Sequence, residues 1–346
     1  MDTKAESRYQ EPHGSTAPPP RAAPSARRWP VTVPLLAVAL TAFSALLPVL
    51  IPLSFLGALT RNARGAPRAL AFIYWYLLCE TAGVAVSLWI WLRHGRNDER
   101  FFAANFRLQC WWANALMRGA EILYELRFHI DGTEALNGPA AIMLPRHSSI
   151  ADTVLPVVYY ALPQGYHLRY VMKRELLWDP CLDIVGNRLP NYFIDRGGAN
   201  SQAEAAAVGA LLASAAPHEG LLLYPEGTRF SPAKRARLED KAASDDALRE
   251  QLERWPDLMP PRLGGSLAVL EANAANPRDL IFLAHTGFGG SSNFVELLNG
   301  SWAHSDVHLF FWRVAARDIP DAPAGRQAFL FQQWDRMQRE VARLRG

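Results

Sequence analysis

This chain of 346 residues has few cysteines and a small net charge. Its three cysteines, Cys79, Cys110 and Cys181, are far apart and odd in number, which fits neither a disulfide framework nor a zinc site. Structural thiols in a reducing compartment are the favoured interpretation. Lysine and arginine exceed aspartate and glutamate by only three. Because no extended basic arm or RNA-binding signature is present either, we expect no nucleic-acid partner.

Charge is almost absent from two stretches near the N-terminus. Residues 31–60 contain no charged side chain, and residues 69–92 contain only Glu80. Each stretch exceeds the roughly 20 residues that span a bilayer core, and the first lies too far along the chain for an ordinary cleaved signal. The sequence therefore predicts a two-segment membrane hairpin at 31–92. Residues 1–30, rich in Pro, Ala, Ser and charge, are predicted to be a disordered cytosolic tail.

The orientation of this hairpin is not set by positive charge, because arginines occur both in its loop and at its flanks. A hairpin places both ends on one side of the membrane, and the uncleaved tail makes that side cytoplasmic. We expect an integral membrane protein, in the inner membrane if bacterial. Pro34, Pro48 and Pro52 would kink the first segment or let it re-enter one leaflet. Glu80 is either functional or protonated or paired with backbone.

Beyond Leu92 the apolar runs become short, which indicates a soluble domain at 93–346. Residues 101–124 read as a helix, either at the membrane interface or packed in the core. Helical patterns at 199–216 and 265–275 alternate with strand patterns, and this alternation predicts an α/β fold with a mixed, mostly parallel sheet flanked by helices. The predicted strands are 124–130, 140–144, 168–172, 192–194, 221–224, 280–284 and 307–312.

A charged insert occupies about 231–262. Within it, Asp245 with Arg249 and Glu250 with Arg254 have the i,i+4 spacing of ion pairs on a helix. Such a segment is either a solvated helix or a lid.

The most informative stretch runs from Pro145 to Asp152, after a short apolar strand and before a helical pattern. A histidine at such a turn can take a proton from a hydroxyl. Asp152, five residues after His147, can curl back to one ring nitrogen, fix the tautomer and stabilise the imidazolium. Taken alone this spacing is weak, because Ser148 and Ser149 suit helix caps and a histidine is common on surfaces.

A second stretch, Leu223 to Phe230, also follows an apolar strand. Gly227 permits a tight turn, and Arg229 offers a planar fork suited to a phosphate group. Glu226 is near enough in sequence to hold that arginine by an ion pair. The simpler interpretation is a turn with one surface salt bridge.

Two further cations follow strands. Arg196 comes directly after the strand at 192–194, and Lys173 follows the preceding strand. In open α/β sheets, ligands bind in the crevice at the carboxyl ends of the strands, so these cations and Arg229 could converge there. Lys173 is the weaker candidate, because it opens an ordinary solvated charge cluster.

Together, these blocks resemble the phospholipid and glycerol acyltransferase superfamily, which includes the lysophosphatidic acid acyltransferases. The resemblance rests on His147 and Asp152 for His-x4-Asp, on Gly186 with the Phe-Ile-x-Arg run ending at Arg196, and on Pro-Glu-Gly-Thr-Arg at 225–229. It covers roughly 100–315, and the segment at 258–264 looks like the lysocardiolipin and acylglycerophosphate acyltransferase branch.

The resemblance implies transfer of a fatty acyl group from acyl-CoA or acyl carrier protein to the free hydroxyl of a lysophospholipid. It implies membrane lipids as surroundings, and no metal or bound cofactor. His147 would be the general base and Asp152 its orienter. The acceptor phosphate would be bound by Arg196, Glu226, Gly227, Thr228 and Arg229.

The chain also departs from the family pattern. Arg146 replaces the common Asn before the histidine, Thr153 replaces a frequent aromatic, and a fourth block around 281–286 is poorly kept. These departures leave donor and acceptor open. A lipid-ester hydrolase is the alternative enzyme, although the chain has no Gly-x-Ser-x-Gly elbow. A non-catalytic lipid-binding or scaffold protein is the alternative outside enzymes.

Overall fold

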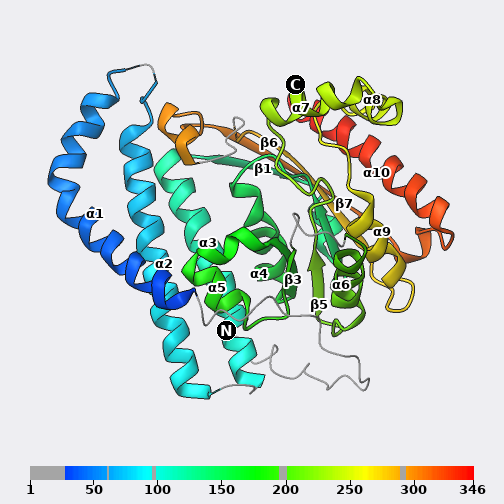
Figure 1. Ribbon diagram of the computed structural model, residues 1–346, viewed down its shortest axis with the longest axis horizontal. Helices are drawn as coiled ribbons and strands as arrows, with labels where there is room; N and C mark the ends of the chain where they lie inside the picture. Colours follow the sequence, from blue (N-terminus) through cyan, green and yellow to red (C-terminus); the bar gives the residue numbers. More distant parts are fainter. Residues whose placement is uncertain (1–27, 61, 96–98, 195–200, 289–293) are drawn as a thin grey trace.

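The computed structural model describes residues 28–60, 62–95, 99–194, 201–288 and 294–346, so nearly all of the predicted tail at 1–30 lies outside it. The described chain forms three layers, a seven-stranded sheet between two layers of helices (Figure 1). The predicted α/β fold is confirmed.

The strand order is β1-β7-β6-β2-β5-β3-β4, and the β6–β7 pair is antiparallel while the other neighbours are parallel. A strand occurs at each of the seven predicted stretches, with ends shifted by up to a few residues. The strands are β1 (Arg127–Asp131), β2 (Ile142–Pro145), β3 (His167–Lys173), β4 (Tyr192–Ile194), β5 (Glu219–Leu222), β6 (Leu280–Thr286) and β7 (Asp306–Val314).

Helices cover both faces of the sheet, and alternate residues of a strand enter different cores. Met143 of β2 joins the core beneath α2 and α3, whereas Ile142 joins the core beneath α6, α9 and α10. The helices are α1 (Trp29–Gly57), α2 (Ala66–His94), α3 (Glu99–Tyr124), α4 (Leu162–Gln164), α5 (Pro180–Gly186), α6 (Ser201–Ala213), α7 (Pro232–Ala242), α8 (Asp246–Arg254), α9 (Leu263–Ala272) and α10 (Pro323–Arg343).

The N-terminal helices α1 and α2 form a hairpin at one side of the sheet layers (Figure 1). Each has 29 residues and is long and apolar enough to cross a membrane. They touch through the stacked rings of Phe43 and Tyr74, whose centroids are 6.0 Å apart. The helix α1 runs unbroken through its three internal prolines and is bent (Figure 1).

One face of α2 is docked on α3 and α5. Glu80 is buried, and its carboxylate accepts the Trp112 Nε1–H at 2.7 Å and the Cys181 backbone N–H at 3.2 Å. At Gly83 the helix approaches α5 so closely that an added Cβ would lie 2.5 Å from the Cys181 Sγ. Glu80 is therefore a paired group that ties α2 to α3 and α5.

The charged insert forms two helices, α7 and α8, rather than one. Asp245 is the N-cap of α8 and accepts the Leu248 backbone N–H at 3.0 Å. Because capping engages this carboxylate, Arg249 pairs with Asp246 instead. The expected Asp245–Arg249 pair is therefore wrong.

The second expected pair of the insert is wrong for a tertiary reason. Arg254 pairs with Asp335 of α10 at 2.6 Å, and the same carboxylate accepts the Trp255 Nε1–H at 3.0 Å. These contacts hold the end of α8 against α10, so Glu250 loses its predicted partner.

Candidate active site

The central strand β2 delivers the first predicted pair to the carboxyl edge of the sheet. The Arg146 N–H donates to the Leu283 carbonyl at 2.9 Å, which extends the pairing with β6. On the other side, Pro145 has no N–H to donate, and the pairing of β2 with β5 ends at Met143. The chain is therefore released from β5 just before His147.

His147 and Asp152 are in direct contact, as their spacing predicted. The Nδ1 atom of His147 lies 2.9 Å from the Asp152 Oδ1, and both residues are buried. The other carboxylate oxygen, Oδ2, accepts the backbone N–H groups of Ser148 at 2.6 Å and Ser149 at 2.7 Å. A carboxylate can only accept here, so the ring proton lies on Nδ1 and leaves a lone pair on Nε2.

The charge of Asp152 is strongly stabilised despite complete burial. Burial opposes ionisation, but the adjacent His147 and the hydrogen bonds from His147 and His285 outweigh it. The pKa of the Asp152 carboxyl is held well below its usual range. Asp152 therefore remains a carboxylate and orients the imidazole without taking the proton itself.

Glu226 is turned into the protein, and it makes no ion pair with Arg229. Its Oε1 accepts the backbone N–H of His147 at 2.8 Å, and its Oε2 accepts that of Met259 at 3.2 Å. Burial raises the pKa of Glu226 to about 8, against the opposing effect of these N–H groups and the Arg146 charge. The predicted ion pair is wrong, because backbone donors compete for the buried carboxylate.

Further contacts join the two motifs into one unit. The Tyr224 hydroxyl donates to the Asp152 carbonyl at 2.8 Å, and the rings of Tyr224 and His147 lie 4.4 Å apart between centroids. The Phe230 N–H donates to the His147 carbonyl at 2.7 Å. The segment 224–230 therefore contacts both His147 and Asp152.

The turn at 227–229 adopts the geometry that its glycine predicts. Gly227 has a φ of 65°, and an added Cβ would lie 2.7 Å from the Arg262 Cδ, so a side chain meets both strain and a clash. Lys234 of α7 donates to the Thr228 Oγ1 at 2.9 Å and to the Arg229 carbonyl at 3.0 Å. Thr228 and Arg229 are half-exposed. Lys234, which holds their loop, lies outside the sequence motif.

Of the remaining candidates, Arg196 lies outside the described residues, so its position is not part of the structure. Gly186 and the Phe193–Ile194 run are described. An added Cβ on Gly186 would lie 2.9 Å from the Phe193 ring, which explains the need for glycine in that block.

Two comparisons with known proteins bear on the family and the fold of this chain. Residues 127–250 match the acyltransferase family model. The matched segment contains His147, Asp152 and the 225–229 motif, and it supports the resemblance to the phospholipid and glycerol acyltransferase superfamily. The fold resembles the crystal structure of the 1-acyl-sn-glycerophosphate (LPA) acyltransferase PlsC from Thermotoga maritima, at a TM-score of 0.55 and 13% identity, over 82% of this chain and 98% of that one. No curated protein matches.

Two site residues of this O-acyltransferase were missed by sequence reasoning. Arg146 is buried and donates to the carbonyls of His285 at 2.7 Å and Asp257 at 3.0 Å. Burial lowers the pKa of its guanidinium from the usual value. His285, at the end of β6, lies 3.5 Å from Asp152. The only signals were the Asn-to-Arg departure and the poorly kept block at 281–286.

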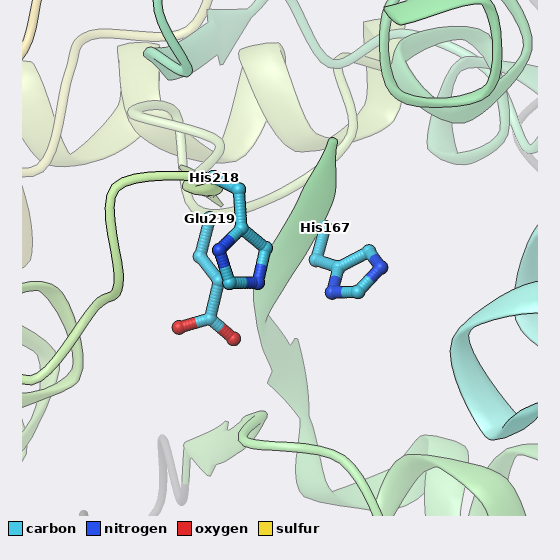
Figure 2. A group of neighbouring side chains, drawn as sticks. All are labelled: His167, His218 and Glu219. Carbon is cyan, nitrogen blue, oxygen red and sulfur yellow. The ribbon is translucent and has the colours of Figure 1, made fainter. Parts of the chain in front are cut away.

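A second cluster of potential ligands lies at the opposite edge of the sheet, where β3 and β5 begin. The ligand atoms of His167, His218 and Glu219 lie within 4.8 Å of one another (Figure 2). The Glu219 Oε2, however, accepts Arg169 Nη2 at 2.5 Å and the Ala216 N–H at 2.9 Å. This carboxylate already neutralises a buried guanidinium, so the cluster is structural and separate from the acyltransferase site.

Proposed function

We propose that this protein transfers a fatty acyl group from an acyl thioester to the free hydroxyl of a lysophospholipid, with lysophosphatidic acid as the first candidate acceptor. The observation that carries the proposal is the buried His147–Asp152 pair, enclosed by the 224–230 segment. The PlsC from Thermotoga maritima, named for an acceptor of this type, shares the fold and supports the choice.

The roles follow from the atoms. The Nε2 lone pair of His147 takes the proton of the acceptor hydroxyl as its oxygen attacks the thioester carbonyl carbon. The resulting oxyanion collapses, the C–S bond breaks, and the thiolate leaves and recovers the proton from Nε2. Asp152 stabilises the imidazolium meanwhile. The products are an ester and a free thiol, and no covalent enzyme intermediate is needed.

The acceptor phosphate is proposed to bind at the turn that follows β5. Gly227 brings the backbone close, and Arg229 supplies a planar fork for the phosphate oxygens. Thr228 adds a hydroxyl, while Glu226 holds His147 from behind. Arg196 is proposed as a second phosphate ligand from the sequence motif alone. Acyl-CoA and acyl carrier protein are both candidate donors.

Membrane association is proposed to occur through the α1–α2 hairpin. The α1 helix exposes large apolar side chains along most of its length, and α2 exposes Trp89, Trp91 and Leu92 near its end. Such a surface suits lipid rather than water. We place the catalytic domain on the cytoplasmic side, which protease protection of sealed vesicles would test.

The decisive experiment is a radiolabelled acyl-CoA assay with purified protein and a panel of lysolipid acceptors, repeated with acyl carrier protein as donor. We expect acyl transfer to yield a labelled diacyl product with at least one phosphate-bearing acceptor. A hydrolase would instead release free fatty acid, from the thioester donor or from a lipid ester, even when no lysolipid acceptor is added. A scaffold would turn over no thioester at all.

A further inference from the structure

His285 stands directly behind the proposed catalytic carboxylate. It is the penultimate residue of β6, its side chain is fully buried, and its Nε2 lies 3.5 Å from the Asp152 Oδ2 and 3.2 Å from the Arg146 carbonyl. A carbonyl can only accept, so the Nε2 atom carries a proton. The Nε2–H group therefore lies between the Arg146 carbonyl and the Asp152 Oδ2, which is the carboxylate oxygen that does not contact His147.

The other ring nitrogen shows that this imidazole is neutral. The His285 Nδ1 is buried and has no hydrogen-bond partner within the described parts of the chain. A bare lone pair is tolerable there, whereas an imidazolium would bury an N–H without an acceptor. The Arg146 guanidinium, which donates to the carbonyl of His285 itself at 2.7 Å, also opposes a second positive charge.

Both carboxylate oxygens of Asp152 accept hydrogen bonds, each from different donors. Oδ1 receives the Nδ1–H of His147, while Oδ2 receives the N–H groups of Ser148 and Ser149 and faces His285. Each donor on Oδ2 stabilises the carboxylate and reduces its pull on the imidazolium of His147. The contacts on Oδ2 also fix the rotation of the carboxylate about its Cβ–Cγ bond.

We propose that His285 is a positioning residue of the acyl transfer, a neutral donor that acts through Asp152 to set the orientation and the basicity of His147. The inference rests on the proposed function, since it requires His147 to be the base. His285 is fully buried behind Asp152, so its proposed effect on His147 is indirect, and no motif of the family resemblance assigned it a role.

The test is the pH profile of kcat/KM, because the acid limb reports protonation of the base. The His285 variants leave the other ionisable groups around His147 and Asp152 unchanged. These are Arg146 after β2, Tyr224 and Glu226 after β5, Asp257 after α8, and Arg345. In His285→Leu, Asp152 loses a donor and attracts the imidazolium more strongly. The acid limb should move to higher pH by roughly half a unit to one unit.

The same variant should lower kcat by about tenfold while the KM of either substrate changes little, since only orientation is lost. His285→Gln carries an amide nitrogen near the Nε2 position and should restore both the limb and kcat. His285→Asn, whose amide lies near the Nδ1 position, should behave like His285→Leu and replaces it if the apolar variant does not fold.

Thr286→Val is the matched control. Thr286 neighbours His285 on β6 and donates to the Leu344 carbonyl at 3.2 Å, away from Asp152. Its loss should leave the acid limb in place. An unshifted limb in both His285→Leu and His285→Asn overturns the inference. If His147→Ala is inactive in that case, the proposed function survives; if His147→Ala is active, the proposed function is what fails.

Discussion

The Glu226 Oε1 accepts the backbone N–H of His147 at 2.8 Å, across 79 positions of the chain. Glu226, which the sequence motif assigned to the phosphate site, therefore supports the backbone of His147, the proposed base. Its second oxygen holds Met259, so one carboxylate joins three segments that converge at the carboxyl edge of the sheet.

Removing that support should destabilise the fold as well as slow the reaction. Glu226→Ala leaves two buried N–H groups without acceptors, at about 1–3 kcal/mol each. We expect a lower Tm and a reduced kcat with a comparatively small change in acceptor KM, measured on detergent-solubilised protein. A rise in KM alone would instead return Glu226 to the phosphate site.

The stability of the protein should also depend on the ionisation of Glu226. An unfolded glutamate ionises near pH 4.5, whereas burial raises the pKa of Glu226 to about 8 in the folded state. Between these values the folded state binds more protons, so this residue makes the free energy of unfolding fall as pH rises. Glu226→Gln should make the decline of Tm from pH 5 to pH 8 shallower, and an unchanged slope would contradict the assignment.

His147→Ala should abolish acyl transfer, since a general base contributes about 10²- to 10⁴-fold. Expression and membrane insertion should be unaffected, because the imidazole contributes no contact to the hairpin. Undiminished turnover would remove the catalytic assignment.

Asp152→Asn is a sharper variant of the same test. Its amide oxygen should keep the N–H groups of Ser148 and Ser149, which turns the NH₂ group toward His147. The imidazole must then accept at Nδ1 and carry its proton on Nε2, where the base needs a lone pair. We expect most activity to be lost with little change in Tm, and full activity would show that the tautomer is unimportant.

Arg229→Ala should raise the acceptor KM more than the donor KM, because the guanidinium is proposed to bind the acceptor phosphate. Arg237→Ala is a control that removes an exposed cation of α7 and leaves the turn untouched. Steady-state kinetics with both substrates varied will separate the effects. A larger change in donor KM would assign Arg229 to the thioester instead.

The contact of α2 with the domain can be tested by Glu80→Ala, which removes the acceptor of Trp112 and Cys181. We expect a clear loss of Tm in detergent, by the cost of two unsatisfied donors. Ser87→Ala is the control, since that hydroxyl donates only to Val84 in the same helix. Equal Tm values for the two variants would show that Glu80 adds nothing to docking.

Much of the fold was predictable because it depends on local patterns. The short apolar runs gave the seven strands, and the charge-free stretches gave α1 and α2. The His147–Asp152 contact was predictable for the same reason, since five residues around a turn can close on themselves.

The remaining features depend on residues distant in sequence. Arg254 at the end of α8 pairs with Asp335 of α10, and the Met259 N–H, rather than Arg229, binds the Glu226 carboxylate. His285 reaches Asp152 only because β6 lies beside β2 in the sheet. No spacing within a motif encodes such neighbours.

The burial of Glu80 also bears on how the protein can be prepared. A fragment that begins after α2 would uncover the Trp112 indole, the Cys181 amide and the surface on which Gly83 rests. A shortened chain must therefore keep α2, and it must also keep Arg28 before α1, whose guanidinium pairs with the buried Asp183 of α5 at 3.0 Å.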